Sequence, residues 1–384
     1  MTGFLQDLLC ARCGEVHDAT VLQNRCACGG TLQARYRSSG TSLSEVRRRP
    51  PTMWRYEELS PLATEPISFS EPQTPLLLME RLSERWGVEV WLKDESPLPG
   101  GTFKARGAAV GLSRAVELGA KRLVMPSAGN AGGAWSLYAA RAGVPITVTM
   151  SKQAPVSNQR EVEMTGAELL LVDGTIADAG ELAKEIATET GAFLSSTFAE
   201  PYRVEGKKTA WLEVFDALGD EVGMRAPSTI VTPVGGGVAA VAAVKAFEEA
   251  GAAGWIGGAL PKIVGVQSEL CAPIVRAFER GEDDVGTWEG PSETVAAGLR
   301  VPAPSEGDLV LQKVRASGGT MIAVPDDDIV AGVHELASTE GVFACPEGAA
   351  SVVAARRLGE RGGLDGPVVL YNTGSGTKYL DLLS

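Results

Sequence analysis

The strongest constraint on the fold is an alternation of short β-branched runs with longer alanine-rich stretches from about residue 75 onward. Stretches such as AGGAWSLYAARAG and GVAAVAAVKAFEEAG predict helices. The runs that predict strands are RLVMP, PITVTM, AELLLVD, STIVTPV, KIVGVQ, TMIAVP and PVVLYN. Strands that are joined through helices run parallel, and parallel sheets are covered on both faces. We therefore predict an α/β protein with two parallel-sheet lobes.

The N-terminal segment is rich in cysteine. Four of the six cysteines, Cys10, Cys13, Cys26 and Cys28, fall within the first thirty residues. Two close pairs separated by a short polar loop are typical of thiolates that converge on one tetrahedral zinc. The second pair is C-x-C rather than C-x-x-C, so a metal-free knuckle with ordinary thiols stays open as an alternative. We predict a small zinc-ribbon-like module over residues 1–36.

The remaining chain divides by composition. The stretch RSSGTSLSEVRRRPP is polar, basic and ended by proline, and it predicts a linker and N-terminal extension over residues 37–74. We expect one large domain over residues 75–384, with a smaller lobe at roughly 105–198 and a larger lobe from the remainder. Cys271 and Cys345 lie among apolar residues and are expected in the core.

Charge and hydropathy exclude several classes of partner. The formal net charge is −13, which disfavours attraction to nucleic acid or to anionic lipid. No apolar run approaches the length of a membrane span, and MTGFLQDLL lacks the basic start and long apolar core of a signal peptide. We expect a cytoplasmic protein that binds neither membranes nor nucleic acid.

Three glycine-rich loops each follow a predicted strand. They are PSAGNAGG (126–133), PVGGGVAA (233–240) and YNTGSGTK (371–378). Ligands of open α/β sheets collect at the carboxyl ends of strands, so we predict that these loops line one cleft. In PVGGGVAA the backbone N–H groups at the helix start could hold a phosphate without a side-chain cation. The alternative is a tight turn without a ligand, and the loop matches neither common nucleotide-binding pattern.

The loop PSAGNAGG offers a hydroxyl at Ser127 and an amide at Asn130. Together with exposed backbone N–H groups, these suit a ligand carboxylate and a second ligand oxygen. Both side chains also suit a helix N-cap, so a structural role is equally open.

Lys104 stands in TFKARG, at the expected first turn of a helix and among small or apolar residues. Desolvation lowers the pKa of such an amine and makes its lone pair available to attack a carbonyl. A phosphate-carrying aldehyde held by a glycine loop would meet Lys104 as a Schiff base. A lysine that extends along the surface to water is the alternative, and the three loops favour the reactive amine.

Taken together, these segments resemble the fold-type II pyridoxal-phosphate enzymes, which include tryptophan synthase β, and most closely the threonine synthase family. The resemblance covers nearly the whole chain and rests on the cysteine-rich start, TFKARG, SAGNAGGAWSLYAARAG, VQSELCAPIVRAF, ETVAAGLRV, EGVFACPEGAAS and NTGSGTK. It implies a tryptophan synthase β-like fold, pyridoxal 5'-phosphate as the cofactor, a small-molecule amino-acid substrate and a homodimer. A structural zinc stays open.

The resemblance also implies roles for individual residues. Lys104 would bind the cofactor covalently and act as catalytic base, while Asn130 would bond the ring hydroxyl. Thr373 would face the pyridine nitrogen. The cofactor phosphate would be held by Val234, Gly235, Gly236, Gly237 and Val238. The substrate carboxylate would be held by Ser127, Gly129 and Ala131.

The implied reaction is that of a carbon–oxygen lyase in threonine biosynthesis, which converts O-phosphohomoserine and water to L-threonine and phosphate by γ-elimination and β-addition. A second anion site is then needed for the leaving phosphate, and Lys93, Arg160 and Lys207 are its candidates. A serine/threonine ammonia-lyase, or a paralogue acting on O-phosphoserine, remains open as an alternative. So does a zinc-ribbon binding module attached to an inactive enzyme-like body.

Overall fold

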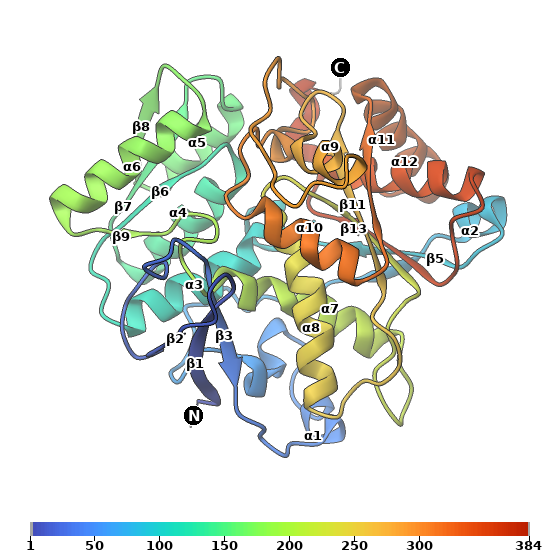
Figure 1. Ribbon diagram of the computed structural model, residues 1–384, viewed down its shortest axis with the longest axis horizontal. Coiled ribbons are helices and arrows are strands. Elements are labelled where there is room, and N and C mark those ends of the chain that lie inside the picture. The colour runs from blue at the N-terminus through green and yellow to red at the C-terminus, as the bar shows by residue number, and fades with distance from the viewer. Residues whose placement is uncertain (1–2, 383–384) are drawn as a thin grey trace. The chain divides into compact units, whose positions relative to one another are not determined.

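The predicted strands and helices are present in the computed structural model, which describes residues 3–382. The chain forms two units. The first comprises the chain up to Pro72 together with Lys104–Thr209, and the second comprises Gln73–Phe103 and the chain from Ala210 onward. Each unit contains one parallel sheet with its own helices (Figure 1). The predicted α/β class is confirmed.

The first unit begins with a small antiparallel sheet that carries the cysteines. Its strands, in the spatial order β2-β1-β3, are β1 (Leu5–Cys10), β2 (Val16–His17) and β3 (Leu32–Tyr36). Cys10 is the last residue of β1, and Cys13 lies in the turn that leads to β2. Leu8 and Ala34 are fully buried, so the module has a small apolar core of its own.

A four-stranded parallel sheet forms the main body of the first unit, in the order β8-β7-β6-β9. Its strands are β6 (Leu123–Pro126), β7 (Ile146–Ser151), β8 (Glu168–Val172) and β9 (Phe193–Leu194). Its helices are α3 (Lys104–Glu117), α4 (Asn130–Ala142), α5 (Val156–Met164) and α6 (Ile176–Thr190). The chain crosses from β6 through β7 to β8 and then returns to β9. Right-handed crossovers therefore place α4 and α5 on one face of the sheet and α6 on the other.

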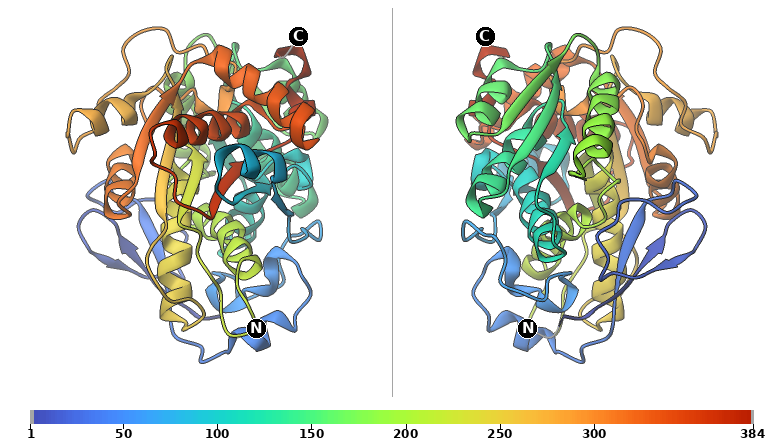
Figure 2. Two further views of the ribbon diagram at one scale, coloured as in Figure 1. Left: turned by 90° about the vertical axis from the view of Figure 1, so that its right-hand side faces the viewer. Right: turned by 90° about the vertical axis from the view of Figure 1, so that its left-hand side faces the viewer.

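The second unit contains a six-stranded sheet in the order β12-β11-β10-β13-β5-β4. Its strands are β4 (Leu76–Leu78), β5 (Val90–Asp94), β10 (Thr229–Pro233), β11 (Lys262–Ser268), β12 (Thr320–Val324) and β13 (Val368–Asn372). Its helices are α2 (Glu80–Trp86), α8 (Val238–Ala252), α9 (Pro273–Glu279), α10 (Gly307–Ala316), α11 (Asp326–Glu340) and α12 (Pro346–Glu360). Only the β4–β5 pair is antiparallel among the described pairs of this sheet. Helices cover both faces of the sheet (Figure 2).

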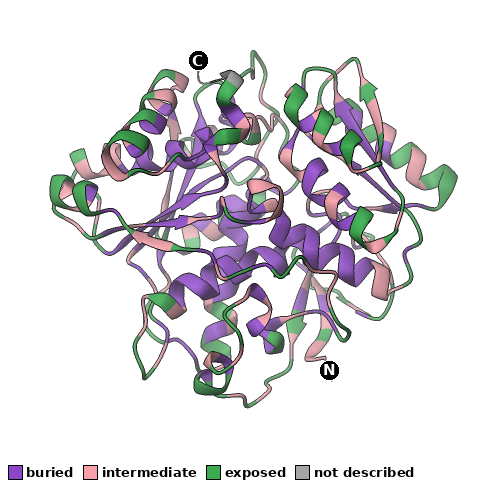
Figure 3. Cartoon of the chain, turned by 180° about the vertical axis from the view of Figure 1, so that it is seen from behind, coloured by how far each residue is buried: buried purple, intermediate pink, exposed green. Residues whose placement is uncertain are grey.

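Burial explains why most strands of the two large sheets are mainly apolar, with β10 and β13 buried along their whole length. Most of their residues are buried, as the purple colour in Figure 3 shows. A side chain on a sheet covered on both faces meets a helix whichever way it points. Seven of these strands were predicted from their apolar runs, whereas β4, β5 and β9, which are short or carry charged residues, were not.

The remaining helices are short or connect the two units in sequence. They are α1 (Leu43–Arg47), α7 (Arg203–Ala217) and the 3₁₀ turns Met53–Arg55, Glu57–Leu59, Pro99–Gly101, Ala297–Leu299 and Gly376–Leu382. Helix α1 lies inside the predicted linker, where Ser42 and Glu45 form a capping box. Among the residues that the structure describes, no helix combines the length and the apolar character needed to cross a membrane.

Candidate active site and cysteine cluster

Lys104 is the first residue of α3, as the sequence predicts, and its side chain is partly buried. The preceding Phe103 is buried, and its backbone N–H donates to the carbonyl oxygen of Thr373 at 2.9 Å. Thr102 forms a bridge with Gly374. These backbone contacts hold the segment that leads into α3 against the end of β13, next to another predicted site residue.

The loop that follows β6 holds the predicted substrate-carboxylate residues. Ser127 is buried, and its Oγ accepts the backbone N–H groups of Gly129 at 3.1 Å and Gly132 at 2.8 Å. The hydroxyl therefore stabilises the start of α4 from two residues before the N-cap. The N-cap residue is Gly129 and Asn130 is the first helical residue, so neither Ser127 nor Asn130 is the cap that the sequence left open. Ala131 is partly buried in the first turn of that helix. The role of Ser127, Gly129 and Ala131 in substrate binding stays a prediction.

Asn130 begins α4 and is oriented by a residue that the sequence did not single out. The Nδ2 atom of Asn158, a buried residue of α5, donates to Oδ1 of Asn130 at 2.9 Å. The Asn130 amide therefore turns its oxygen toward α5 and its NH₂ group the other way. A Cβ on Gly129 would lie only 3.1 Å from Oδ1 of Asn158, so the loop packs closely against this side chain.

Helix α7 brings a second lysine next to the helix of Lys104. The two helices touch through their backbones, since a Cβ on Gly206 would lie 1.9 Å from the carbonyl oxygen of Arg106. Lys207 is 5% exposed, and its Cε lies 3.3 Å from the Cβ position of Gly107, one turn of α3 beyond Lys104. Burial lowers the pKa of Lys207 well below its ordinary value, and the positive charge of Lys104 lowers that pKa further.

The other two cations considered for the leaving phosphate are placed elsewhere. Lys93 is 1% exposed and forms an ion pair of 2.6 Å with Glu213, which is also buried. Its charge is therefore neutralised inside the second unit. Arg160 is exposed on α5. Of the three candidates, Lys207 alone is both buried and adjacent to the Lys104 helix.

The second unit holds the predicted phosphate loop between β10 and α8. Gly237 adopts φ +80° and precedes the first residue of α8, and a Cβ there would lie 2.2 Å from Cγ2 of Val310. A Cβ on Gly235 would lie 2.1 Å from the carbonyl oxygen of Gly298. Both positions therefore require glycine for the backbone to follow this path. Val234 and Val238 are buried at either end, and Gly236 is partly exposed in the middle.

Thr373 follows β13 and is buried in the second unit. Its Oγ1 lies 3.3 Å from Sγ of Cys345, the residue that caps α12. Burial raises the pKa of the Cys345 thiol, so that a neutral thiol faces a neutral hydroxyl. Cys345 is buried, as expected from the sequence, but its contact with Thr373 was not anticipated.

The predicted site residues are thus divided between the two units. The first unit holds Lys104, Ser127, Gly129, Asn130 and Ala131, and the second holds the loop 234–238 and Thr373. That both groups face one cleft stays a prediction.

The four N-terminal cysteines converge on one point. Their Sγ atoms all lie within 4.8 Å of one another, with Cys10 and Cys28 at 3.5 Å and Cys13 and Cys26 at 3.6 Å. Four thiolates around a tetrahedral zinc are separated by about 3.8 Å, so the cluster fits this ion. Burial opposes ionisation of Cys10, but N–H groups of the knuckle and neighbouring thiols bring its pKa down to about 6.

Comparison with known proteins shows which family this arrangement belongs to. A model described as pyridoxal-phosphate dependent enzyme matches residues 67–374. The threonine synthase of Methanosarcina acetivorans is 34% identical, covering 96% of this chain and 91% of its own. That of Methanocaldococcus jannaschii is 32% identical, covering 97% and 93%. The chain belongs to the threonine synthase family of pyridoxal-phosphate-dependent enzymes.

Solved structures of the same fold confirm the tryptophan synthase β-like, fold-type II architecture. A T.th. threonine deaminase matches with a TM-score of 0.68 and 25% identity, covering 87% of this chain and 98% of its own. Maize serine racemase matches with a TM-score of 0.67 and 24% identity, covering 79% and 88%. A model described as the zinc finger domain of DNA polymerase-epsilon matches residues 4–44, which supports the zinc-ribbon-like module.

The residues present fit the cofactor of this family. The loop 234–238 offers backbone N–H groups at a helix start in a path that side chains at Gly235 and Gly237 would block, which suits a phosphate. Lys104 supplies an amine and Asn130 an oriented amide. Thr373 supplies a neutral hydroxyl. We keep the assignment of these individual roles as a prediction.

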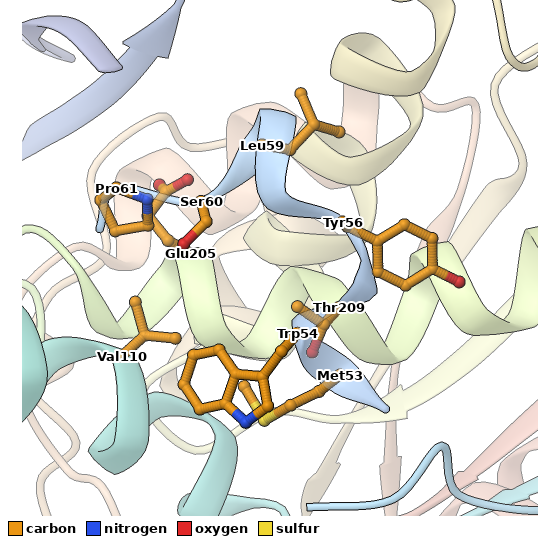
Figure 4. Close-up of a pocket in the computed structure, with 9 residues that line it drawn as sticks. All are labelled: Met53, Trp54, Tyr56, Leu59, Ser60, Pro61, Val110, Glu205 and Thr209. Atoms are coloured by element: carbon orange, nitrogen blue, oxygen red, sulfur yellow. The ribbon is translucent and has the colours of Figure 1, made fainter. Parts of the chain in front are cut away.

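Two hollows lie away from these residues. The cavity drawn in Figure 4, among the turns after α1 and the helices α3 and α7, holds about 10 Å³, and Glu205 lies on its wall. Such a space accommodates about one water molecule and no amino acid. A larger groove of about 750 Å³ lies in the second unit along 218–225 and 254–257. None of the predicted site residues lines either hollow.

Sequence reasoning missed three residues that shape the site. They are Asn158, Glu200 and Arg203, the last two joined by an ion pair of 3.0 Å. Asn158 stands in SNQR, which carries no recognisable pattern. A signal was present in EPYRVEGKKT, where Arg203 and Lys207 are spaced by one helical turn and so share a helix face.

Proposed function

We propose that this protein converts O-phosphohomoserine and water to L-threonine and inorganic phosphate, as a carbon–oxygen lyase of the threonine synthase family. The relatives that share most of its length are named threonine synthase. The observation that carries the choice of a phosphorylated substrate is Lys207, a buried cation beside the helix of Lys104. A lysine in this position could contact an anionic leaving group of a substrate that is held beside Lys104.

The bound cofactor would supply an electron-withdrawing group conjugated to the α-carbon of the substrate. Lys104 is then the residue that moves protons. Its Nζ removes the α-proton of the substrate and next acts on the β-carbon, where water adds. Lys104 is partly buried in the first turn of α3, and an amine held at such a position can work as a general base.

The remaining residues bind and orient. Asn130 would donate its NH₂ group to the ring hydroxyl, because Asn158 holds the amide oxygen. The N–H groups of the loop 234–238 would hold the cofactor phosphate. Thr373 would meet the ring nitrogen with a hydroxyl rather than an acid, which would leave that nitrogen largely unprotonated and favour elimination and replacement over transamination.

Lys207 would receive the phosphate that leaves the substrate. Burial and the positive charges of Lys104 and Arg203 lower the pKa of Lys207, whereas the carboxylate of Glu200 raises it. A bound phosphate dianion beside Lys207 would favour its charged form further.

A second candidate activity is that of a serine/threonine ammonia-lyase. It is favoured by the similarity to the T.th. threonine deaminase, which covers 87% of this chain. A substrate panel separates the two. We expect the cofactor-loaded protein to release phosphate and threonine in equal amounts from O-phosphohomoserine, and little 2-oxo acid from threonine, serine or O-phosphoserine. Efficient 2-oxo acid formation without phosphate release would overturn the proposal.

Two substitutions assign the roles. Lys104→Ala should abolish the visible absorbance of the bound cofactor together with turnover. Lys207→Gln should keep the absorbance and raise KM for the phosphorylated substrate by about tenfold or more, because one charge-assisted bond to phosphate is lost. Arg160→Gln, on the surface of α5, serves as the matched control and should behave as the wild type.

A cytoplasmic location, a homodimer and the lack of nucleic-acid binding are further parts of this proposal. They come from the sequence and from the resemblance to the family. Cell fractionation, sedimentation and a filter-binding assay with nucleic acid would test them in turn.

A further inference from the structure

Thr31 joins the cysteine cluster to a turn of the enzyme body within the first unit. Its carbonyl oxygen accepts the N–H of Ala11 at 2.9 Å, and Ala11 lies inside the knuckle between Cys10 and Cys13. Its hydroxyl donates to the carbonyl oxygen of Phe198 at 2.8 Å, and Thr31 is 2% exposed. A single buried residue is thus bonded to the cysteine knuckle on one side and to Phe198 on the other.

The turn that Thr31 contacts is conformationally strained. Phe198 has φ +59°, a left-handed conformation that bulky residues rarely adopt. Such residues persist only where the surrounding structure holds them, and they cluster at functional sites. Asn24 adds a second restraint from the same module, since its Nδ2 donates to the carbonyl oxygens of Leu194 at 2.7 Å and Ala199 at 3.4 Å.

The strained turn is followed directly by a buried ion pair, Glu200 and Arg203, at the start of α7. Glu200, fully buried, accepts the backbone N–H of Arg203 at 2.7 Å and its Nε at 3.0 Å. The guanidinium of Arg203 lies over the ring of Trp135, 5.0 Å from the ring centre. Lys207 follows one helical turn later, against the helix of Lys104.

We infer that Thr31 is a positioning residue for the active site. By holding the strained Phe198 turn, the cysteine-rich module sets Glu200 and Arg203, and through α7 it sets the distance of Lys207 from the Lys104 helix. We call this role of the module a brace: it restrains the turn that precedes the proposed anion-binding residue Lys207, and it is not an independent binding domain. The kinetic part of the inference rests on the proposed function, and the structural part does not.

The test replaces the Thr31 hydroxyl with a methyl group of the same shape. In Thr31→Val, hydrogen exchange of the amides between residues 194 and 209 should accelerate by about tenfold, because one buried hydrogen bond that restrains the turn is lost. KM for O-phosphohomoserine should rise more than kcat falls, since the cation is displaced while the amine of Lys104 remains. Thr31→Ser restores the hydroxyl and should restore both measurements.

The chain offers a matched control in the same module. Thr20 is exposed, and among the described residues its hydroxyl bonds only to Asp18. Thr20→Val should leave exchange and kinetics unchanged. Should Thr31→Val fold poorly, Asn24→Ala removes the partly exposed second restraint and should give a smaller change of the same kind.

The outcomes separate this inference from the proposed function. Wild-type exchange over 194–209 in Thr31→Val would overturn the brace. Faster exchange with unchanged KM and kcat would overturn the positioning role. A wild-type protein without activity on O-phosphohomoserine would refute the proposed function, while the exchange measurements would still decide on the brace.

Discussion

At the scale of single residues, Asn158 decides which end of the Asn130 amide faces a ligand. The two ends of an amide are nearly the same in shape but opposite in hydrogen bonding, so a neighbour has to select between them. Asn158 does this by donating to the oxygen at 2.9 Å from a buried position on α5. The selection places a donor where the cofactor's ring hydroxyl is expected.

Substitution of Asn158 should therefore weaken cofactor binding. Asn158→Ala lets the Asn130 amide rotate and should lower the affinity for pyridoxal phosphate by about tenfold, the effect of one lost hydrogen bond. Asn158→Asp should be worse, because a carboxylate only accepts and turns the NH₂ group of Asn130 toward itself. Titration of cofactor into the apo-protein, followed by visible absorbance, measures both. Equal affinity of the two variants would contradict the selection.

Lys207 should give the reaction an alkaline limit. Its pKa is lowered by burial, so it loses its proton at a lower pH than an exposed lysine does, and a neutral amine binds phosphate weakly. KM for the phosphorylated substrate should thus rise as the pH increases through this lowered pKa. Lys207→Arg, whose guanidinium stays charged, should remove the alkaline rise. If the KM of the wild type stayed constant up to the pKa of an exposed lysine, Lys207 would not be the residue that binds the substrate phosphate.

The same shift has a defined sign for stability. The folded chain holds the Lys207 proton less tightly than the unfolded chain does, because folding buries the ammonium. The associated destabilisation is complete below the folded pKa and disappears as the pH rises to the unfolded pKa. Denaturation curves of the wild type and Lys207→Gln should converge over that interval.

At the scale of elements, the start of α8 shows that close packing requires glycine in the loop that is predicted to bind a phosphate. The glycines between β10 and α8 allow the backbone to pass close to Gly298 and Val310, where no side chain fits. The N–H groups at the helix start are then oriented by the helix itself. In the same unit, the buried ion pair of Lys93 and Glu213 links β5 to α7. These two charges neutralise each other, so neither is available to a ligand.

A pair of glycine substitutions tests this requirement. Gly237→Ala puts a Cβ on a residue with φ +80° and 2.2 Å from Val310, and it should lower stability by about 1–2 kcal/mol or more and weaken cofactor binding. Gly180→Ala, in the middle of α6 with open space around it, should instead stabilise by about 0.5–1 kcal/mol. Urea unfolding of both variants gives the comparison. A neutral Gly237→Ala would show that the loop tolerates another path.

At the scale of the whole molecule, we expect the cysteine cluster to affect the stability of the first unit, with which its module is in contact. Four Sγ atoms within 4.8 Å of one another are held by short loops, and the small module around them buries few side chains. A bound metal would therefore contribute much of its folding free energy. Hydrogen bonds of the module reach the segment 194–205 of the same unit, and the carbonyl oxygen of Ala19 also accepts from Arg114 of α3 at 2.8 Å.

Removal of the metal should affect this unit selectively. The purified protein should contain about one zinc per chain, and a strong chelator should lower Tm and accelerate exchange over 194–209. The amides of β10, in the core of the second unit, should keep their protection. Cys13→Ser should reproduce the effect of the chelator, because it removes one ligand. Full retention of Tm after complete metal removal would show that the cluster folds without it.

Features that depend on residues adjacent in sequence could be predicted, and features that depend on contacts between distant residues could not. The seven predicted strands, the helices α4 and α8, the three glycine loops and the cysteine pairs could be predicted because each depends mainly on neighbours in sequence, through apolar runs, helix periodicity and turn geometry. The position of Lys104 at a helix start was readable for the same reason. The choice among Lys93, Arg160 and Lys207 was not, because it depends on whether a distant carboxylate such as Glu213 meets the amine. The strands β4, β5 and β9 were not predicted, because they are short or carry charged residues whose burial depends on distant partners.

The local pattern of this chain thus specified its α/β class, its cysteine cluster and the chemical groups available for catalysis. It did not specify which of those groups are neutralised, oriented or strained. Asn130 and Asn158, or Thr31 and Phe198, are far apart in sequence and meet only when folding of the first unit brings them within hydrogen-bond distance. A hydrogen bond acts over about 3 Å, so its partners are set by packing, whereas the tendency to form a strand or helix is set by adjacent residues.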